Sequence, residues 1–253
     1  MKIKNIYLNK KTPVISIAIA LLCVIITLIS QLVPSTYMAF TFSYPVKYSW
    51  QLLTYVFLQG IPGELLPPDF PYSAMELMLG HLGYNLMLIL PFGILVEKVI
   101  GSKRFLALFA SAWIVDVILN FIMGVIYTKD GESFAVSGAS GIAFSFMPVG
   151  VYILCVMAKR YGFGKLFRQV SFYLLMGIAL PTAVISLIPN IAGVAGIPSM
   201  IIHLIALAIG VVFAFICKGK IACFLTIQML NILYRNMGNN DVTIRINNLE
   251  GSL

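Results

Sequence analysis

The sequence predicts an all-α, polytopic membrane protein whose six transmembrane helices form one bundle. Apolar residues make up 60% of the chain and charged residues only 10%, whereas soluble domains are nearer half apolar and a quarter charged. The apolar residues are also grouped into runs that are long enough to cross a hydrocarbon core of about 30 Å. Together these observations exclude a soluble globular domain with a large core.

Six apolar runs, separated by polar breaks, define the predicted spans. The first follows a basic N-terminal segment, as the apolar part of a secretory signal peptide does, but it is long for such a peptide. No convincing small-x-small cleavage site follows it at Pro34-Ser35-Thr36, so we interpret it as an uncleaved span. The expected spans are residues 13–33, 77–96, 104–127, 137–157, 170–189 and 197–217.

The basic residues predict the orientation of the bundle. If the N-terminus is cytoplasmic, all of the 17 basic residues except Lys47 and Lys129 lie on the cytoplasmic side, which agrees with the positive-inside rule. This distribution explains the net charge of +8 without a nucleic-acid partner. We expect an integral protein of a bacterial plasma membrane, with a cytoplasmic N-terminal segment (1–12), a six-span domain (13–217) and a cytoplasmic C-terminal tail (218–253).

Two further features limit the interpretation. The connection over residues 34–78 is too long and too apolar for a plain linker, and its aromatic residues and prolines suit an element at the membrane interface. The cysteines have no C-x-x-C spacing and no histidine nearby, so no zinc site or disulfide framework is predicted. They are Cys23, Cys155, Cys217 and Cys223, all in or beside apolar runs.

The only two histidines of the chain fall at the same predicted depth as one serine. The second, fourth and sixth spans run in the same direction, so their N-terminal ends share the outer face. His81 lies near the start of the second span, Ser140 in the first turn of the fourth, and His203 about two turns into the sixth. Packing alone does not require three reactive side chains at one depth on three helices, so we interpret them as a catalytic site.

The chemistry of these residues favours nucleophilic catalysis. A serine hydroxyl becomes a useful nucleophile when an imidazole takes its proton, and no acidic residue lies beside His203 in sequence or at its predicted depth. This favours a dyad of Ser140 and His203, with Phe144 one turn along from Ser140 as a stacking partner for the ring. Asn85 and His81, which share a helical face, and backbone N–H groups at the start of span four are the candidate oxyanion donors.

Small residues surround the predicted dyad. Ser140 stands between Gly138 and Gly141, and Ala206 and Gly210 follow His203 at helical spacing. Small residues let helix backbones approach closely. We therefore expect span six to pack on span four and to bring the histidine to the serine.

In combination, these motifs resemble the rhomboid family of intramembrane serine proteases, over roughly residues 13–217. The resemblance implies that Ser140 is the nucleophile and His203 the base, that His81 and Asn85 line the oxyanion hole, and that span five with the 189–198 loop gates access. It further implies single-span membrane proteins as substrates, cut near the outer end of their helix, with no metal or cofactor. The motifs are Gly138-Ala139-Ser140-Gly141, His81-x-x-x-Asn85, Trp50-Gln51-Leu52-Leu53-Thr54, Phe92-Gly93, Glu97, Gly101 and Arg104-Phe105.

Some positions depart from the family pattern, and two other functions stay open. Ala206 replaces a usual glycine, Pro91 interrupts span two, and acidic residues around 64–76 lengthen the first loop. The main alternative is an inactive rhomboid-like membrane chaperone or trafficking factor, although such a protein typically lacks the serine or the base. The other is a small transporter that uses Asp116 and the histidines as a relay, although no inverted repeat supports it. We expect Asp116 to have a buried hydrogen-bonding role, with Asn120 as its candidate partner.

Overall fold

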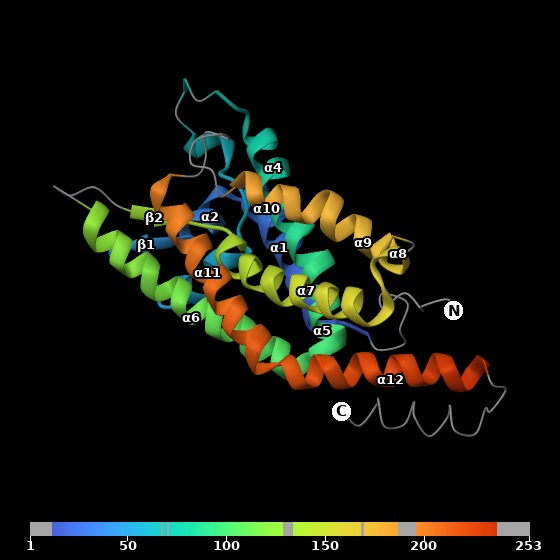
Figure 1. Ribbon diagram of the computed structural model, residues 1–253. Helices are drawn as coiled ribbons and strands as arrows, with labels where there is room; N and C mark the ends of the chain where they lie inside the picture. The colour runs from blue at the N-terminus through green and yellow to red at the C-terminus, as the bar shows by residue number, and fades with distance from the viewer. Residues whose placement is uncertain are drawn as a thin grey trace.

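The computed structural model describes residues 12–66, 68–69, 71–128, 134–167, 170–186 and 196–236 (Figure 1). Helices dominate these residues, and the prediction of an all-α polytopic bundle is confirmed. The expected N-terminal segment up to residue 11 and the tail beyond residue 236 lie outside the described residues, as does most of the 189–198 loop.

Five helices of the described part are long and apolar enough to cross a membrane. The fifth predicted span is described only over residues 170–186, which form three consecutive pieces of one continuous helical run, and its apolar stretch there, Leu174–Ile185, is shorter than the other spans. The five are α1 (Val14–Leu32), α4 to α5 (Ala74–Ile100), α6 (Ser102–Tyr127), α7 (Ser140–Tyr161) and α11 (Ile197–Ile216). The three pieces are α9 (Val170–Tyr173), η5 (Leu174–Ala179) and α10 (Leu180–Ser186).

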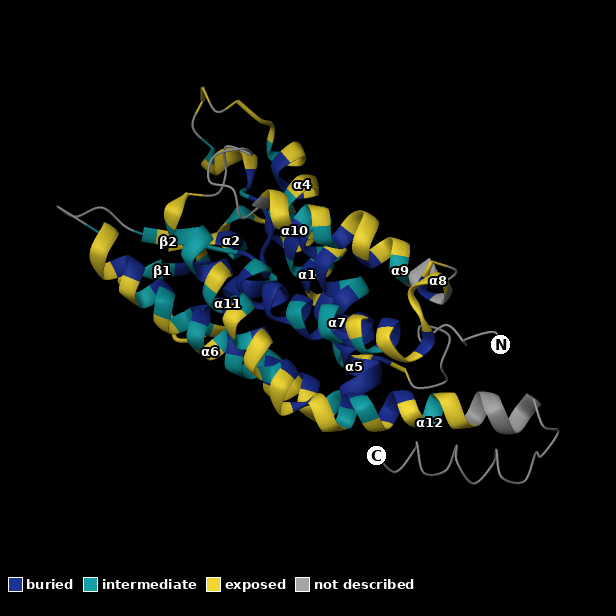
Figure 2. Ribbon diagram, viewed as in Figure 1, coloured by how far each residue is buried: buried dark blue, intermediate teal, exposed yellow. Residues whose placement is uncertain are grey.

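Helix α7 is the central element of the bundle. In its most apolar window 72% of the residues are buried, against at most 44% in the other long helices. The outer faces of α1, α6 and α11 instead carry exposed apolar side chains such as Leu21, Ile118 and Val212, and Figure 2 shows the exposed residues of α6 and α11. Such apolar outer faces are what a lipid-facing helix needs, so the burial pattern agrees with an integral membrane protein.

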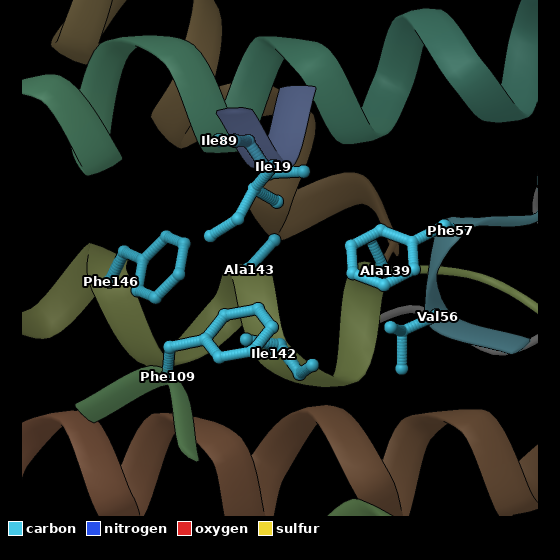
Figure 3. A pocket seen from close by; sticks show the side chains of 9 residues that line it. All are labelled: Ile19, Val56, Phe57, Ile89, Phe109, Ala139, Ile142, Ala143 and Phe146. Atoms are coloured by element: carbon cyan, nitrogen blue, oxygen red, sulfur yellow. The ribbon is translucent and has the colours of Figure 1, made fainter. Parts of the chain in front are cut away.

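Apolar packing fixes the start of α7. The side chains that converge there enclose a cavity of only about 10 Å³, and Figure 3 shows them from close by. They come from α1, from the segment after it, from the helix that runs from α4 to α5, from α6 and from the start of α7 itself. They are Ile19, Val56, Phe57, Ile89, Phe109, Ala139, Ile142, Ala143 and Phe146.

Pro91 lies within the rod that runs from α4 (Ala74–Leu88) to α5 (Ile94–Ile100). A proline removes a helical hydrogen bond and clashes with the preceding turn. The rod accommodates it by widening into a π-helical turn, η4 (Ile89–Gly93), without breaking. The disturbance is therefore confined to a turn that begins eight residues after His81.

Glu97 ties the far end of this rod to the first turn of α1. Its carboxylate accepts hydrogen bonds from the backbone N–H of Ile15 at 3.1 Å and of Ser16 at 2.8 Å, and from the Ser16 and Ser102 hydroxyls at 2.7 and 2.8 Å. The first N–H groups of a helix have no partner inside the helix, and a carboxylate satisfies them well. Glu97 thus has a structural role at this end of the second span.

Replacing Glu97 by alanine should therefore destabilise the bundle strongly. Several buried donors lose a charged acceptor at once, and each such loss typically costs about 1.5–3 kcal/mol. We expect a decrease of about 3 kcal/mol or more in the free energy of unfolding, measured by denaturant titration in mixed micelles. Glu64→Ala, which removes an exposed carboxylate, is the control and should change stability by less than about 0.5 kcal/mol. Equal effects of the two substitutions would refute this role of Glu97.

The segment between α1 and α4 is folded, although it contains no long helix. It consists of α2 (Pro34–Phe40), β1 (Phe42–Tyr44), α3 (Gln51–Thr54), η2 (Tyr55–Phe57) and η3 (Gly63–Leu65). The Gln51 amide accepts from the backbone N–H of Lys47 and Tyr48, and Trp113 of α6 donates to the Leu52 carbonyl at 2.7 Å. Strand β1 pairs antiparallel with β2 (Phe134–Val136), which leads into α7. This ribbon was not predicted from the sequence.

Helix α12 (Lys218–Asn236) packs beneath the opposite end of the bundle. Its first turns bury Ile221, Phe224 and Leu225, and the Tyr161 hydroxyl of α7 donates to the Leu225 carbonyl at 2.7 Å. The short helix α8 (Phe163–Leu166) follows α7 at the same end (Figure 1). The beginning of the C-terminal segment is thus part of the folded unit.

Candidate active site

Ser140 is the first residue of α7, and the turn before it is fixed by main-chain contacts. Gly138 has a φ of +132°, which L side chains rarely adopt, and its N–H donates to the Tyr55 carbonyl at 3.0 Å. In the described residues no backbone acceptor pairs with the N–H groups of Ser140 and Gly141. The N-terminus of α7 therefore presents free donors and a partial positive charge beside the serine.

His81 faces this turn in a defined tautomer. Its Nδ1 accepts a hydrogen bond from the backbone N–H of Gly60 at 3.1 Å, so in the neutral ring Nε2 carries the proton. A side chain at Gly138 would stand within 2.9 Å of Nε2, which means that the imidazole edge lies directly over the glycine. The turn thus requires glycine for both its conformation and its space.

His203 lies against α7 one turn along from Ser140. Its ring stacks on Phe144 with centroids 4.2 Å apart and an angle of 12° between the planes. The imidazole is 5% exposed. Because Phe144 and Ser140 share a helical face, this stack holds the imidazole on the side of α7 that carries the serine.

The predicted close packing of α11 on α7 is confirmed. Ala206 and Gly210 are buried along with His203, and the contact between these two helices is the most extensive among the described elements. An added Cβ at Gly210 would collide with the Ser145 carbonyl and stand 2.8 Å from Pro148 Cδ. The absence of a side chain at Gly210 therefore sets how closely the two helices approach.

One cavity of about 690 Å³ brings Ser140, His81 and His203 together. Its wall also includes Gly138 and Gly141. No hydrogen bond joins the described side chains of Ser140 and His203 in this structure, although catalytic hydrogen bonds often tighten only when substrate binds. Residues of the β2 strand line the cavity as well, and residues of α10 and α11 complete its wall.

Asn85 lies outside this wall. Its side chain is fully buried, and its amide donates to Gln59 Oε1 at 2.6 Å and to the His81 carbonyl at 3.1 Å. Gln59 in turn donates to the Val56 carbonyl at 3.2 Å, which fixes its own orientation and therefore that of Asn85. Both N–H groups of the Asn85 amide are thus occupied, one by the loop and the other by the main chain of His81.

A comparison with protein families supplies the decisive observation. Residues 72–220, more than half of the chain, match the Rhomboid domain. The chain belongs to the rhomboid family. Members of this family are generally intramembrane serine proteases that act on membrane proteins within the bilayer. No curated protein and no solved structure matches the chain.

In this rhomboid an acidic residue also lines the cavity, although we expected none at the depth of His203. Asp116 of α6 forms part of the same wall and accepts a hydrogen bond from the Tyr55 hydroxyl at 2.5 Å. Burial, followed by the neighbouring carboxylate, raises the pKa of Tyr55 far above its usual value, so the phenol stays protonated and donates. Asn120, the expected hydrogen-bond partner of Asp116, lies one turn along α6 and lines the same cavity, and the hydrogen bond between them stays a prediction.

Sequence reasoning missed the loop residues of this rhomboid that hold the site. Gln59 and Gly60 position Asn85 and His81, and Tyr55 positions both Gly138 and Asp116. The available signal was a glutamine and a glycine immediately after an apolar stretch. That signal could not reveal which helices the two residues would contact.

Replacing Gln59 by methionine should weaken both stability and catalysis. The substitution keeps the volume but leaves the Asn85 amide and the Val56 carbonyl without their buried partner, which typically costs about 1–3 kcal/mol. We expect a loss in this range from the free energy of unfolding, together with a lower kcat at nearly constant KM.

Gln31→Met is the matched control for Gln59→Met. The Gln31 Nε2 atom is buried and has no hydrogen-bond partner among the described residues, so the substitution should be neutral or slightly stabilising. If the two variants behave alike in unfolding and in kinetics, Gln59 has no special role in the site.

Proposed function

We propose that this rhomboid is an active intramembrane serine endopeptidase, with Ser140 as nucleophile and His203 as general base. The observation that carries the proposal is that both side chains line one cavity, with the His203 ring held by Phe144 on the serine side of α7. A purely structural serine and histidine would not need to face a shared cavity.

The proposed reaction follows from this arrangement. Ser140 Oγ attacks the carbonyl carbon of the scissile bond while His203 takes the hydroxyl proton, and His203 then gives that proton to the leaving amine. A water molecule hydrolyses the resulting acyl-enzyme by the same proton transfers in reverse. The negative oxygen of each tetrahedral intermediate would be stabilised by the His81 Nε2–H and by the N–H groups of Ser140 and Gly141.

The remaining predicted residues have supporting roles in this proposal. Gly138 gives the turn its conformation and leaves room for the His81 ring. Gly141 leaves room for the side chain of Asp116. Asn85 fixes the start of span two through Gln59 instead of donating to the oxyanion directly, since its amide is already occupied.

The proposed substrates are membrane proteins with a single helix. With both termini in the cytoplasm, the cavity opens toward the outer face, and cleavage would fall near the outer end of the substrate helix. A helical peptide bond must unwind before attack, so small or helix-breaking residues should surround the cut. Thr182 and Ile185 of α10 line the cavity, which supports access beside this short helix.

The test uses the purified full chain in lipid vesicles with a single-span reporter that carries small residues near its outer end. We expect one cut, mapped by mass spectrometry, and covalent labelling of Ser140 by a fluorophosphonate. A folded protein that neither cuts a panel of such reporters nor labels at Ser140 would refute the proposal. That outcome would favour the inactive membrane chaperone or trafficking factor.

A further inference from the structure

One face of α6 holds the loop that leads to the cavity. Trp113 and Asp116 are three residues apart on this helix, so they share a face. Trp113 donates to the Leu52 carbonyl at 2.7 Å, and Asp116 accepts from the Tyr55 hydroxyl at 2.5 Å. Two hydrogen bonds so close together along the loop leave this part of it little freedom to move relative to α6.

Aromatic packing strengthens the same attachment. The ring of Phe42 in β1 lies edge-on against Tyr55, with centroids 5.7 Å apart, and against Phe121 of α6, with centroids 5.3 Å apart. Phe42 and Tyr55 are both buried, and edge-to-face pairs of this kind add to the stability gained from burial alone. The Tyr55 ring is therefore enclosed, and its hydroxyl is directed at Asp116.

Tyr55 extends the attachment to the turn that carries the serine. Its carbonyl accepts from the Gly138 N–H at 3.0 Å, while its hydroxyl donates to Asp116. The Asp116 carboxylate is buried and also packs on α7 itself, since a Cβ added to Gly141 would collide with it. Asp116 thus acts on the chain before Ser140 through Tyr55 and contacts the chain after Ser140 directly.

We propose that Asp116 is a positioning residue, which acts through Tyr55 to fix the turn over residues 138–141. This inference rests on the proposed function, because the turn carries Ser140 and the N–H groups that would stabilise the negative oxygen. Such donors act only if they point at the place where that oxygen forms, and a misplacement of about 1 Å can cost about 100-fold in rate. In this proposal Asp116 takes no part in proton transfer.

Tyr55→Phe is the first test, made with the full chain in vesicles and the reporter whose cut has been mapped. The substitution removes the hydroxyl that binds Asp116 and keeps the ring in the cavity wall. We expect kcat to fall by about 10- to 100-fold, with KM within about twofold of wild type. The rate of fluorophosphonate labelling should fall by a similar factor, because the phosphoryl oxygen of the reagent needs the same donors.

Tyr161→Phe is the matched control for Tyr55→Phe. Tyr161 is also buried, and its hydroxyl donates to the Leu225 carbonyl at 2.7 Å, at the opposite end of the bundle. Both variants lose one hydrogen bond of a buried tyrosine, so both should unfold at a lower denaturant concentration than the wild type. Only Tyr55→Phe should lose kcat, measured where both variants are fully folded.

Two substitutions of Asp116 separate positioning from a general loss of stability. Asp116→Asn keeps an acceptor for the Tyr55 hydroxyl, so kcat should stay within about fivefold of wild type. Asp116→Leu has a similar shape but no acceptor, and it should lose about as much kcat as Tyr55→Phe. The double variant of Tyr55→Phe and Asp116→Leu should be no slower than the slower single variant, since both changes break the same hydrogen bond.

The possible outcomes separate this inference from the proposed function. If the wild type cuts the reporter and Tyr55→Phe loses no more kcat than Tyr161→Phe, Asp116 does not position the turn. An equal loss of kcat in Asp116→Asn and Asp116→Leu also refutes the inference, because the carboxylate would then act other than by holding Tyr55. If the wild type neither cuts nor labels, the proposed function itself fails. The two Asp116 variants decide the question if Tyr55→Phe does not fold.

Discussion

Replacing Ser140 by alanine should reduce the cleavage of a single-span reporter by at least about 10⁴-fold. Without its nucleophile a serine protease has only the oxyanion donors and substrate binding left to act. In a well-studied example this loss lowers kcat by about 10⁶-fold. Ser140 is half-buried at the start of α7 and, in the described residues, its side chain holds no other group in place. The loss should therefore appear in kcat, measured with substrate in excess, and fluorophosphonate labelling should disappear with it.

Ser145→Ala is the matched control for Ser140→Ala. Ser145 is in the same helix and fully buried, and its hydroxyl donates to the Ile142 carbonyl at 2.7 Å. Its replacement should lower stability by no more than about 1.5 kcal/mol and leave cleavage within a few fold. If cleavage persists in Ser140→Ala, or is lost equally in both variants, Ser140 is not the nucleophile.

The second large effect is expected at Gly210. A methyl group there would collide with the Ser145 carbonyl and with the ring of Pro148, so Gly210→Ala must push α11 away from α7. A shift of 1 Å in a catalytic group can cost about 100-fold in rate, and overpacking typically costs about 1–3 kcal/mol in stability. Since α11 carries His203, we expect kcat to fall by about 100-fold, with destabilisation in that range.

Gly83→Ala makes the same chemical change where there is room for it. Gly83 lies in α4, and an added Cβ there would meet nothing within 4 Å. This variant should keep both wild-type stability and wild-type cleavage. The readout that separates geometry from stability is kcat at a temperature where both variants are fully folded. Equal kcat values for the two variants there would contradict the role assigned to Gly210.

Much of the site could be predicted because it depends on helix periodicity and topology. The direction of the spans places the starts of α4, α7 and α11 at one end, and a spacing of three or four residues selects the face. These rules predicted that His81, Ser140 and His203 would meet and that Gly210 would face α7.

The parts that could not be predicted depend on how a loop docks between helices. Gln59 occupies the amide of Asn85, and no periodicity relates residues 59 and 85. Asp116 was expected to be buried, but its place in the cavity wall depends on the rotation of α6 about its axis. The π-helical stretch η5 within the fifth predicted span was not predicted either, because apolar composition does not specify where a helix widens.

The loop from Tyr55 to Gly60 has a consequence for how the protein matures. Its main chain binds the turn before Ser140 and the ring of His81, and its side chains bind Asp116 and Asn85. Long apolar helices can insert into a membrane one at a time, before they associate. The reactive geometry, however, exists only after this loop has settled between them. The candidate site is therefore assembled from the loop and the helices together, and inserted helices that have not yet taken up this loop would lack it.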